Sequence, residues 1–218
     1  MRALLIMARA PRPGATKTRL EPLLGPDGCA LLQSELIRHT ATRAPQSGRH
    51  VWLAYTPRDA HDELAPLVPP TVRLFPQSDG DLGARLRAAT QHVFRSGASS
   101  VTVIGTDAPT LGAGHLDAAD AALSTGNDAC LVPALDGGYA LIALSRPMPE
   151  AFDLPRASWG GPHVLALTLG AIATAGRTAH VLDPVADLDA PADAVAMLED
   201  PALPRPIRRL LAGALVTA

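Results

Sequence analysis

Lysine and aromatic residues are both scarce in this sequence of 218 residues. Only 3% of the residues are aromatic although 47% are hydrophobic, so leucine, valine, isoleucine and alanine must fill the core. The net charge of −2 leaves no basic excess, which argues against nucleic acid or an anionic membrane as a partner. Lys17 is the only lysine, and every other member of the Lys and Arg total is an arginine.

Motifs for several common chemistries are also missing. The two cysteines, Cys29 and Cys130, form no metal-binding or redox spacing, which favours a reduced, cytoplasmic setting. The histidines lack the HxH and HExxH patterns of zinc sites, and no GxSxG sequence indicates a serine nucleophile. No run approaches the roughly 18 apolar residues of a membrane span, and the first apolar run is too short for a signal peptide. We therefore expect a cytoplasmic protein without membrane association.

Short apolar runs that favour strands alternate with amphipathic stretches that favour helices. Strands are expected at residues 3–8, 50–55, 71–75, 100–105, 128–134, 139–144 and 179–185, and helices at 29–44, 81–97, 113–124, 161–176 and 190–200. This alternation predicts one α/β domain, residues 1–218, with a mostly parallel sheet. Residues 201–218 are expected to form a proline-punctuated tail that ends in a short helix, with Arg205, Arg208 and Arg209 on a solvated face.

Polar segments, three of which contain glycine, follow five of the expected strands. In α/β sheets of this kind, ligands bind beyond the carboxyl ends of the strands. The five segments read RAPRPGATKTRL, PQSDGDLGARL, TDAPTL, LDGGY and ADLDAPAD. Because all five segments begin at the carboxyl ends of strands, we expect them to line one shared cleft.

The loop that contains Gly14, Lys17 and Arg19 has the composition of a phosphate-binding loop. Backbone N–H groups and basic side chains in such loops neutralise phosphate. The spacing is not that of a Walker A loop, which has glycine directly before the lysine. The alternative interpretation is a solvated loop with incidental charge. A lone lysine in an arginine-rich chain favours function, because a compact ammonium suits close contact with one phosphate.

Three aspartates at strand ends are candidate metal ligands. Asp107 follows a buried strand, and Asp187 and Asp189 are two residues apart, so both point to one side of an extended segment. Carboxylates are the ligands that Mg²⁺ prefers. The alternative is that Asp107 and Asp189 are N-caps of the helices that follow. We expect Lys17 and Asp107 to lie in one cleft, with Asp189 or Asp187 as the second metal ligand.

Two further segments have both a structural and a functional interpretation. The Asp-Gly-Gly-Tyr sequence at residues 136–139 predicts a hairpin turn, and the same turn can present its aspartate or its bare backbone to a ligand. Asp81 is a good N-cap for the helix that follows it. In the functional interpretation, the stretch from Gly80 to Gly83 lets the backbone approach a base or a ribose.

Taken in order, these motifs resemble those of a known bacterial family. The matching residues are Gly14-x-x-Lys17-Thr-Arg-Leu20, Asp81-Leu-Gly83-x-Arg85, Gly105-Thr-Asp107-x-Pro109, Asp136-Gly-Gly-Tyr139 and Asp187-Leu-Asp189-x-Pro191-x-Asp193. The chain resembles A-type glycosyltransferase-like proteins of the nucleotide-diphospho-sugar transferase superfamily from residue 1 to about residue 195. The guanylyltransferases of deazaflavin cofactor biosynthesis are a more distant likeness. The resemblance implies a Rossmann-like, three-layer α/β/α sandwich of the GT-A type.

The resemblance also implies roles for individual residues. The implied catalytic residues are Lys17, Arg19 and Asp107. The implied nucleotide and phosphate contacts are Ala8, Gly14, Lys17, Arg19, Gln77, Gly80, Leu82, Gly83 and Arg85. The implied acceptor side holds Asp136, Gly137, Gly138, Tyr139 and Trp159, and the implied ligands of Mg²⁺ (or Mn²⁺) are Asp107, Asp189 and Asp187. The chain departs from the family at Trp159-Gly160-Gly161, where Trp-Ser-Thr is expected.

Three functions are compatible with these residues. The resemblance favours a glycosyltransferase that uses a nucleotide-diphospho-sugar donor and a small-molecule acceptor. The alternative is a nucleotidyltransferase in which a phosphorylated acceptor displaces pyrophosphate; the absence of an Asp-x-Asp motif at the central strand end favours it. A third possibility, favoured by Gly160 and Gly161, is a nucleotide-binding module without turnover. The sequence leaves the base, the sugar, the acceptor and the oligomeric state open.

Overall fold

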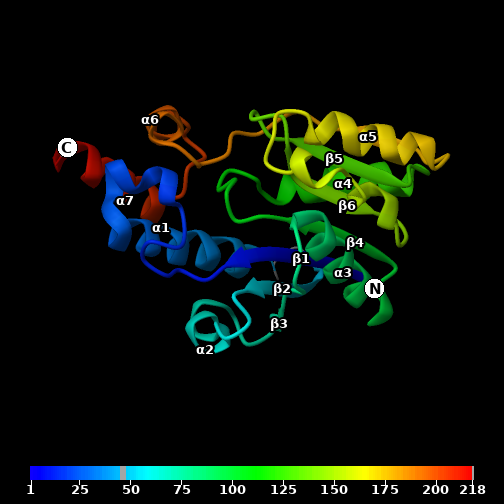
Figure 1. Cartoon of the computed structure of the whole chain (residues 1–218), viewed down its shortest axis with the longest axis horizontal. Helices are drawn as coiled ribbons and strands as arrows, with labels where there is room; N and C mark the ends of the chain where they lie inside the picture. The colour runs from blue at the N-terminus through cyan, green and yellow to red at the C-terminus, as the bar shows by residue number, and fades with distance from the viewer. Residues whose placement is uncertain (45–47, 218) are drawn as a thin grey trace.

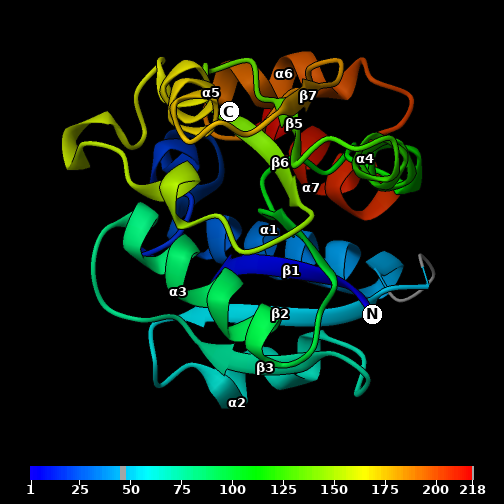
Figure 2. The ribbon, with the colours of Figure 1, turned by 90° about the vertical axis from the view of Figure 1, so that its right-hand side faces the viewer.

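The computed structural model describes residues 1–44 and 48–217 (Figure 1). Seven strands form one sheet in the order β3-β2-β1-β4-β6-β5-β7. The strands are β1 (Arg2–Arg9), β2 (His50–Thr56), β3 (Arg73–Pro76), β4 (Ser100–Ile104), β5 (Ala129–Pro133), β6 (Tyr139–Leu144) and β7 (Ala179–Val181). Only β6 runs against its neighbours, and the other pairs are parallel, as β1, β2 and β3 illustrate in Figure 2. The mostly parallel sheet predicted from the sequence is confirmed.

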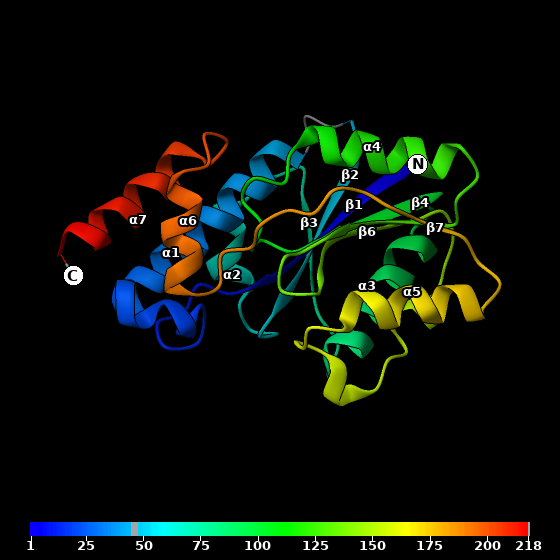
Figure 3. The ribbon, with the colours of Figure 1, turned by 90° about the horizontal axis from the view of Figure 1, so that it is seen from above.

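Helices cover both faces of this sheet. The helices are α1 (Glu21–Arg43), α2 (His61–Leu64), α3 (Leu82–Arg95), α4 (Ala113–Ser124), α5 (Val164–Thr174), α6 (Pro191–Leu198) and α7 (Arg205–Thr217). Residues of α1, α2 and α4 pack in one core cluster, and residues of α3 and α5 pack in a second cluster. Figure 3 shows α4 on one side of the sheet with α3 and α5 on the other. No helix in the described ranges has both the length and the apolar character needed to cross a membrane.

Strand β1 illustrates why the central strands read as continuous apolar runs. Successive side chains of a strand point to opposite faces. Leu4 and Ile6 therefore pack against the α1 and α4 side, while Ala3 and Leu5 pack against the α3 and α5 side. All four are buried. A parallel strand covered on both faces requires this pattern.

The C-terminal segment is part of the packed structure rather than a loose tail. Helices α1, α6 and α7 share a third core cluster, and Figure 1 shows them gathered at one end of the molecule. Arg205 and Arg209 are exposed as expected. The expectation for Arg208 was wrong, because its guanidinium donates hydrogen bonds to the carbonyls of Leu198 and Asp200 at the end of α6. Arg208 thus satisfies carbonyls that the helix leaves open.

Two element boundaries differ most from the sequence expectation. Helix α1 begins at Glu21 instead of residue 29, and it consists of two helical segments that meet at Gly25, whose backbone is not helical (φ 67°). Pro26 then occupies the first turn after the kink, where a missing N–H group costs little. Strand β7 stops at Val181, and only Val185 continues the pairing as an isolated bridge. Pro184, which has no N–H group to donate, lies between them.

Candidate active site

A cavity of about 480 Å³ opens at the carboxyl edge of the sheet. Residues from the ends of β1, β3 and β4, from the β5–β6 turn and from the segment after β7 line it. The five sequence segments therefore converge, as predicted. The predicted site residues that line the cavity are Ala8, Lys17, Gln77, Leu82, Arg85, Asp107, Asp136, Gly138, Tyr139, Trp159, Asp187 and Asp189.

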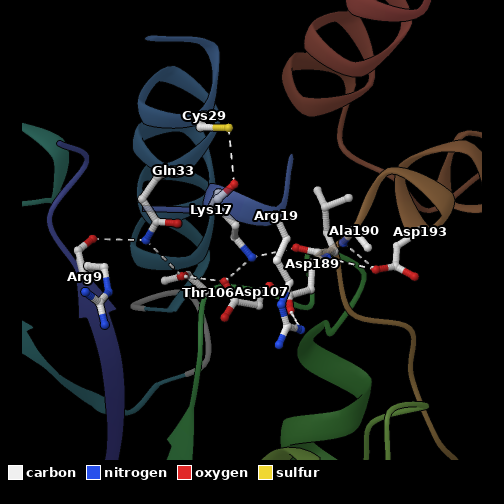
Figure 4. Close-up of polar contacts among 11 residues, drawn as sticks. Arg9, Lys17, Arg19, Cys29, Gln33, Thr106, Asp107, Asp189, Ala190 and Asp193 are labelled. Atoms are coloured by element: carbon white, nitrogen blue, oxygen red, sulfur yellow. Dashed lines mark hydrogen bonds and ion pairs between the residues drawn. The ribbon is translucent and has the colours of Figure 1, made fainter. Parts of the chain in front are cut away.

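Lys17 is the most constrained of these residues. Its backbone has a φ of 50° and a ψ of 35°, and it is the only non-glycine residue with positive φ in the described part of the chain. This left-handed conformation costs energy for a residue other than glycine, and residues that adopt it occur frequently at functional sites. The side chain is only 4% exposed, and Nζ lies 2.6 Å from Oδ1 of Asp107 and donates to the carbonyl of Leu188 at 2.6 Å (Figure 4). The expected proximity of Lys17 and Asp107 is confirmed.

These contacts tie three strand ends into one unit. The N–H group of Leu188 donates to the carbonyl of Asp107 at 2.8 Å, so the exits of β4 and β7 are joined by backbone as well as through Lys17. The buried thiol of Cys29 donates to the carbonyl of Lys17 at 3.3 Å. We call residues 16–19, Asp107 and residues 187–189 the loop wall of the cavity.

Arg19 lies at the rim of the loop wall. Its guanidinium pairs with Asp189 at 2.6 Å, and its side chain is 72% exposed. Arg19 and Gly14 are absent from the cavity lining. Gly14 instead provides a positive φ of 70° in the loop. The two basic residues of the loop wall thus differ, because Lys17 faces inward and Arg19 faces solvent.

The carboxylates of the cavity repel one another. Burial raises the pKa of Asp187, and the negative charges of Asp136, Asp193 and Asp189 raise that pKa further. A divalent cation would relieve this repulsion, and carboxylate oxygens suit Mg²⁺ and Mn²⁺. The donor set therefore fits such an ion in chemistry. In the described ranges, no three His, Cys, Asp or Glu side chains are already arranged to hold a metal.

The capping interpretation of Asp107 and Asp189 is wrong. Helix α4 begins after Gly112, several residues beyond Asp107. At α6, the carboxylate of Asp193 accepts hydrogen bonds from the N–H groups of Asp189 and Ala190, at 3.1 and 2.7 Å. Because Asp193 caps the helix from within, the side chain of Asp189 remains at the cavity.

The side-chain amide of Gln77 forms hydrogen bonds with other groups of the protein. Its Nε2 donates to the carbonyls of Ala8 and Ala54, at 3.3 and 2.9 Å, and its Oε1 accepts from Nη1 of Arg85 at 3.3 Å. Gln77 is buried, so these bonds satisfy a group that would otherwise be costly. Its observed role is to join β1 to β2 and to orient Arg85.

Asp81 and Gly83 hold the start of α3. Asp81 is the N-cap, as the structural interpretation predicted, and its carboxylate accepts from the N–H group of Ala84 at 2.9 Å. Gly83 is buried, and a Cβ there would lie 2.5 Å from the carbonyl of Phe152 and 2.7 Å from Nε1 of Trp159. Neither Gly83 nor Gly80 lines the cavity. The absent side chain of Gly83 makes room for Trp159.

The turn at residues 136–139 is a hairpin turn, as predicted. Oδ1 of Asp136 accepts from the N–H group of Gly138 at 2.8 Å. Gly137 has a φ of 92°, and a Cβ there would lie 2.1 Å from the carbonyl oxygen of Pro162. Gly137 does not line the cavity. Its missing side chain leaves room for the backbone of Pro162.

Residues 152–164 therefore rest on two glycines, Gly83 and Gly137, and we call this segment the strap wall. It brings Trp159, Gly160, Gly161 and Val164 to the cavity. Tyr139 lies beside it, with its hydroxyl buried near that of Thr168, and burial raises the pKa of Tyr139. The strap wall carries no ion pair in the described structure and holds its place by close packing.

Sequence reasoning missed several residues of the cavity, of which Arg9 and Gln33 matter most. Gln33 on α1 is buried and donates to the carbonyl of Arg9 at 3.1 Å and to Oγ1 of Thr106 at 3.3 Å (Figure 4). It thus joins the ends of β1 and β4. A lone polar residue on the apolar stripe of a helix was the available signal. Arg9 was visible as the last residue before the proline-rich loop.

Solved structures share this fold. A candidate nucleotide-diphospho-sugar transferase from Desulfovibrio desulfuricans G20 matches with a TM-score of 0.88 and 27% identity, over 99% of this chain and 95% of that one. CMP:2-keto-3-deoxy-manno-octonic acid synthetase in complex with CTP matches with a TM-score of 0.61 and 13% identity, over 97% and 98% of the two chains. Rv0371c from Mycobacterium tuberculosis H37Rv in complex with manganese matches with a TM-score of 0.56 and 15% identity, over 92% and 100%.

These matches confirm the predicted fold class, an α/β fold like that of nucleotide-diphospho-sugar transferases. No curated protein matches the sequence. A family profile described as an uncharacterized protein conserved in bacteria (DUF2064) matches residues 38–160, more than half of the chain.

Proposed function

The chain belongs to the DUF2064 family, and we propose that it is a metal-dependent transferase that acts on a nucleotide substrate. The observation that carries this proposal is the buried, backbone-strained Lys17 paired with Asp107 in a cavity at the carboxyl edge of the sheet. Cations and carboxylates gathered at such an edge suit a charged phosphate chain. The name of the similar Desulfovibrio protein supports a transferase.

In this proposal the residues of the loop wall bind the phosphates of the substrate. Lys17 Nζ would donate to an oxygen of the departing phosphate, and Arg19 would approach the same group from the rim. Asp107, Asp189 and Asp187 would hold Mg²⁺ or Mn²⁺, which would neutralise the phosphate charge when bound. The crowding that raises the pKa of Asp187 supports this assignment, as does the manganese in the Rv0371c structure.

The remaining lining divides between nucleotide and acceptor. We assign the nucleotide to the side of Ala8, Leu82 and Arg85, which lies at the ends of β1 and β3. We assign the small-molecule acceptor to the side of the strap wall and the hairpin turn. Trp159, Tyr139 and Gly138 line that side, and Asp136 adds a carboxylate.

The reaction that we favour is glycosyl transfer from a nucleotide-diphospho-sugar. The name of the Desulfovibrio protein supports it, and so does the Asp-Gly-Gly-Tyr turn beside the cavity. Nucleotidyl transfer with release of pyrophosphate is the second candidate. The CTP bound to the synthetase of the same fold supports that alternative, as does the lone Asp107 at the end of β4.

A thermal-shift panel tests the proposal directly. Nucleoside triphosphates and nucleotide sugars would each be added with and without Mg²⁺. A ligand that binds only the folded protein stabilises it, by more the further its concentration exceeds its dissociation constant. We expect at least one compound to raise the melting temperature only with Mg²⁺, and Lys17→Ala to show a smaller shift than the wild type. Absence of any nucleotide response in the wild type would overturn the proposed function.

Product analysis separates the two reactions. Glycosyl transfer releases a nucleoside diphosphate from a nucleotide sugar, whereas nucleotidyl transfer releases pyrophosphate from a triphosphate. A shift with triphosphates but not with nucleotide sugars, followed by pyrophosphate release, would replace the first candidate by the second.

A further inference from the structure

The basic side chains around the cavity fall into two groups that differ in their partners. On the loop wall, Lys17 pairs with Asp107 and Arg19 pairs with Asp189, both at 2.6 Å. On the other side, Arg9 and Arg85 line the same cavity. Their side-chain hydrogen bonds go to neutral acceptors only.

Arg85 is held in place without being neutralised. Its Nη1 donates to Oε1 of Gln77 and its Nε donates to the carbonyl of Asp81, both at 3.3 Å. Arg9 makes one long contact of 3.5 Å to the carbonyl of Ala15. Among the residues that the structure describes, neither guanidinium forms an ion pair with a carboxylate.

The two guanidinium groups also repel each other. Burial lowers the pKa of Arg85, and the positive charge of Arg9 lowers it further, while the carboxylate of Asp81 acts in the opposite direction and more weakly. Two like charges that share a cavity wall leave a positive potential there. An anion between them would remove the repulsion and use donors that are now directed at weak acceptors.

We propose that Arg9 and Arg85 form a second anion subsite, separate from the loop wall, that binds a phosphate monoester. This inference rests on the proposed function of the cavity as a nucleotide site. A monoester carries close to two negative charges at neutral pH, which matches two guanidinium groups, and guanidinium forks bind phosphate in a bidentate way. Of the cavity carboxylates, Asp107, Asp187 and Asp189 belong to the loop wall and Asp136 belongs to the hairpin turn. None of the four forms an ion pair with Arg9 or Arg85 in the described structure.

The phosphate has two possible sources, which share this chemistry. It is either a phosphate of the nucleotide itself or the phosphate of a phosphorylated acceptor. The geometry of the cavity serves both, because Arg85 starts on the nucleotide side and the cavity continues to the strap wall.

Isothermal titration with inorganic phosphate, at constant ionic strength, tests the subsite on the full chain. The double variant Arg9→Gln/Arg85→Gln should bind phosphate about tenfold or more weakly than the wild type, since each change removes hydrogen bonds to a charged group. Arg87→Gln is the matched control, because Arg87 lies on the same helix, is exposed and does not line the cavity. Arg85→Lys keeps the charge and should recover part of the affinity. Melting temperatures of all variants show whether they remain folded.

Equal phosphate affinity in the double variant and in Arg87→Gln would overturn the subsite, as would absence of phosphate binding to the wild type. Phosphate binding that depends on the arginines, without binding of any nucleoside triphosphate or nucleotide sugar, would leave the subsite standing and sink the proposed function. Nucleotide binding together with phosphate binding that does not depend on the two arginines would overturn the subsite and leave the proposed function standing.

A second titration identifies the source of the phosphate. Inorganic phosphate is added to protein saturated with the triphosphate or nucleotide sugar that binds most tightly. If arginine-dependent binding persists, the subsite serves the acceptor; if it disappears, the subsite holds a phosphate of the nucleotide.

Discussion

The loop wall and the strap wall border the same cavity but are held by different forces. The loop wall is fixed by charge: Lys17 joins Asp107 and Leu188, and Arg19 joins Asp189. The strap wall is fixed by shape, because the backbone around Phe152 and Pro162 fills the space that side chains at Gly83 and Gly137 would need.

This difference shows how one wall of the cavity can rearrange when a ligand binds while the other keeps its shape. Ion pairs can be exchanged for pairs with a ligand, so a phosphate or a cation can rearrange the loop wall at modest cost. A close-packed contact cannot be exchanged for a contact with a ligand in this way, since protein interiors tolerate little change in volume. Substitutions that add volume beneath the strap wall should therefore act on stability, and substitutions in the loop wall should act on binding as well as on the ion pairs.

The largest expected effect on stability comes from Gly137→Ala. The added Cβ would lie 2.1 Å from the carbonyl oxygen of Pro162, at a backbone φ of 92°. We expect the free energy of unfolding to fall by about 3 kcal/mol, at the upper end for overpacking, because strain at positive φ adds to the clash. Urea denaturation monitored by circular dichroism measures this.

Gly170→Ala is the matched control for that substitution. Gly170 lies in α5, directly after the strap wall, and a Cβ there meets no atom within 4 Å. Alanine in a helix interior should raise the free energy of unfolding by up to about 1 kcal/mol. Equal stabilities of the two variants would show that Gly137 does not seat Pro162.

The second prediction separates the partners of the ion pair on the loop wall. The Lys17 side chain is 4% exposed and that of Asp107 is 56% exposed. Asp107→Asn leaves a buried ammonium with only a carbonyl partner and should lower the free energy of unfolding by about 1–3 kcal/mol. Lys17→Met leaves a solvated carboxylate but also removes the donor to the carbonyl of Leu188, so it should lower stability by about 1 kcal/mol, less than Asp107→Asn. Equal losses in the two variants would contradict the inferred asymmetry.

The smallest predicted effect concerns Asp187. Its pKa in the folded protein lies above the unfolded value, so the folded state holds the proton more tightly. The contribution of Asp187 to stability is then most favourable below the unfolded pKa and falls as the pH rises through the folded pKa. Asp187→Asn should raise the free energy of unfolding at pH 7 by up to about 1 kcal/mol, with no gain in strong acid.

Asp153→Asn is the control for the pH experiment, because Asp153 is exposed and lies outside the cavity lining. It should leave the stability at pH 7 unchanged. A loss of stability in Asp187→Asn at pH 7 would show that the carboxylate is stabilised by its neighbours rather than repelled.

The position of the cavity residues at strand ends was readable from the sequence because it follows from local rules. Apolar runs at β1 and β4 fix the buried strands, and polar residues such as Asp107 stand at their ends. Parallel strands bring those ends to one edge. The hairpin turn and the Asp81 cap were likewise local, since each depends on residues within one turn.

The long-range partners of individual residues were not readable in this way. That Lys17 meets Leu188, 171 residues further along the chain, depends on how α1 and α6 pack together. The same holds for Gly83 and Gly137, whose sequence neighbours indicate turns and caps, whereas their contacts come from a strap far along the chain. Long-range packing also explains why the amide of Gln77 is used within the protein.

The affinity for nucleotide in the presence of Mg²⁺, measured by isothermal titration, tests the central claim most directly. The compound with the largest thermal shift would be titrated into the wild type, Lys17→Ala and the control Arg12→Ala, whose arginine lies in the same loop but pairs with Glu63. The account predicts a loss of about 1–3 kcal/mol in binding free energy for Lys17→Ala, as expected when a charged hydrogen bond is removed, and no loss for Arg12→Ala. Unchanged affinity in Lys17→Ala would contradict the claim that the buried lysine grips the nucleotide phosphate.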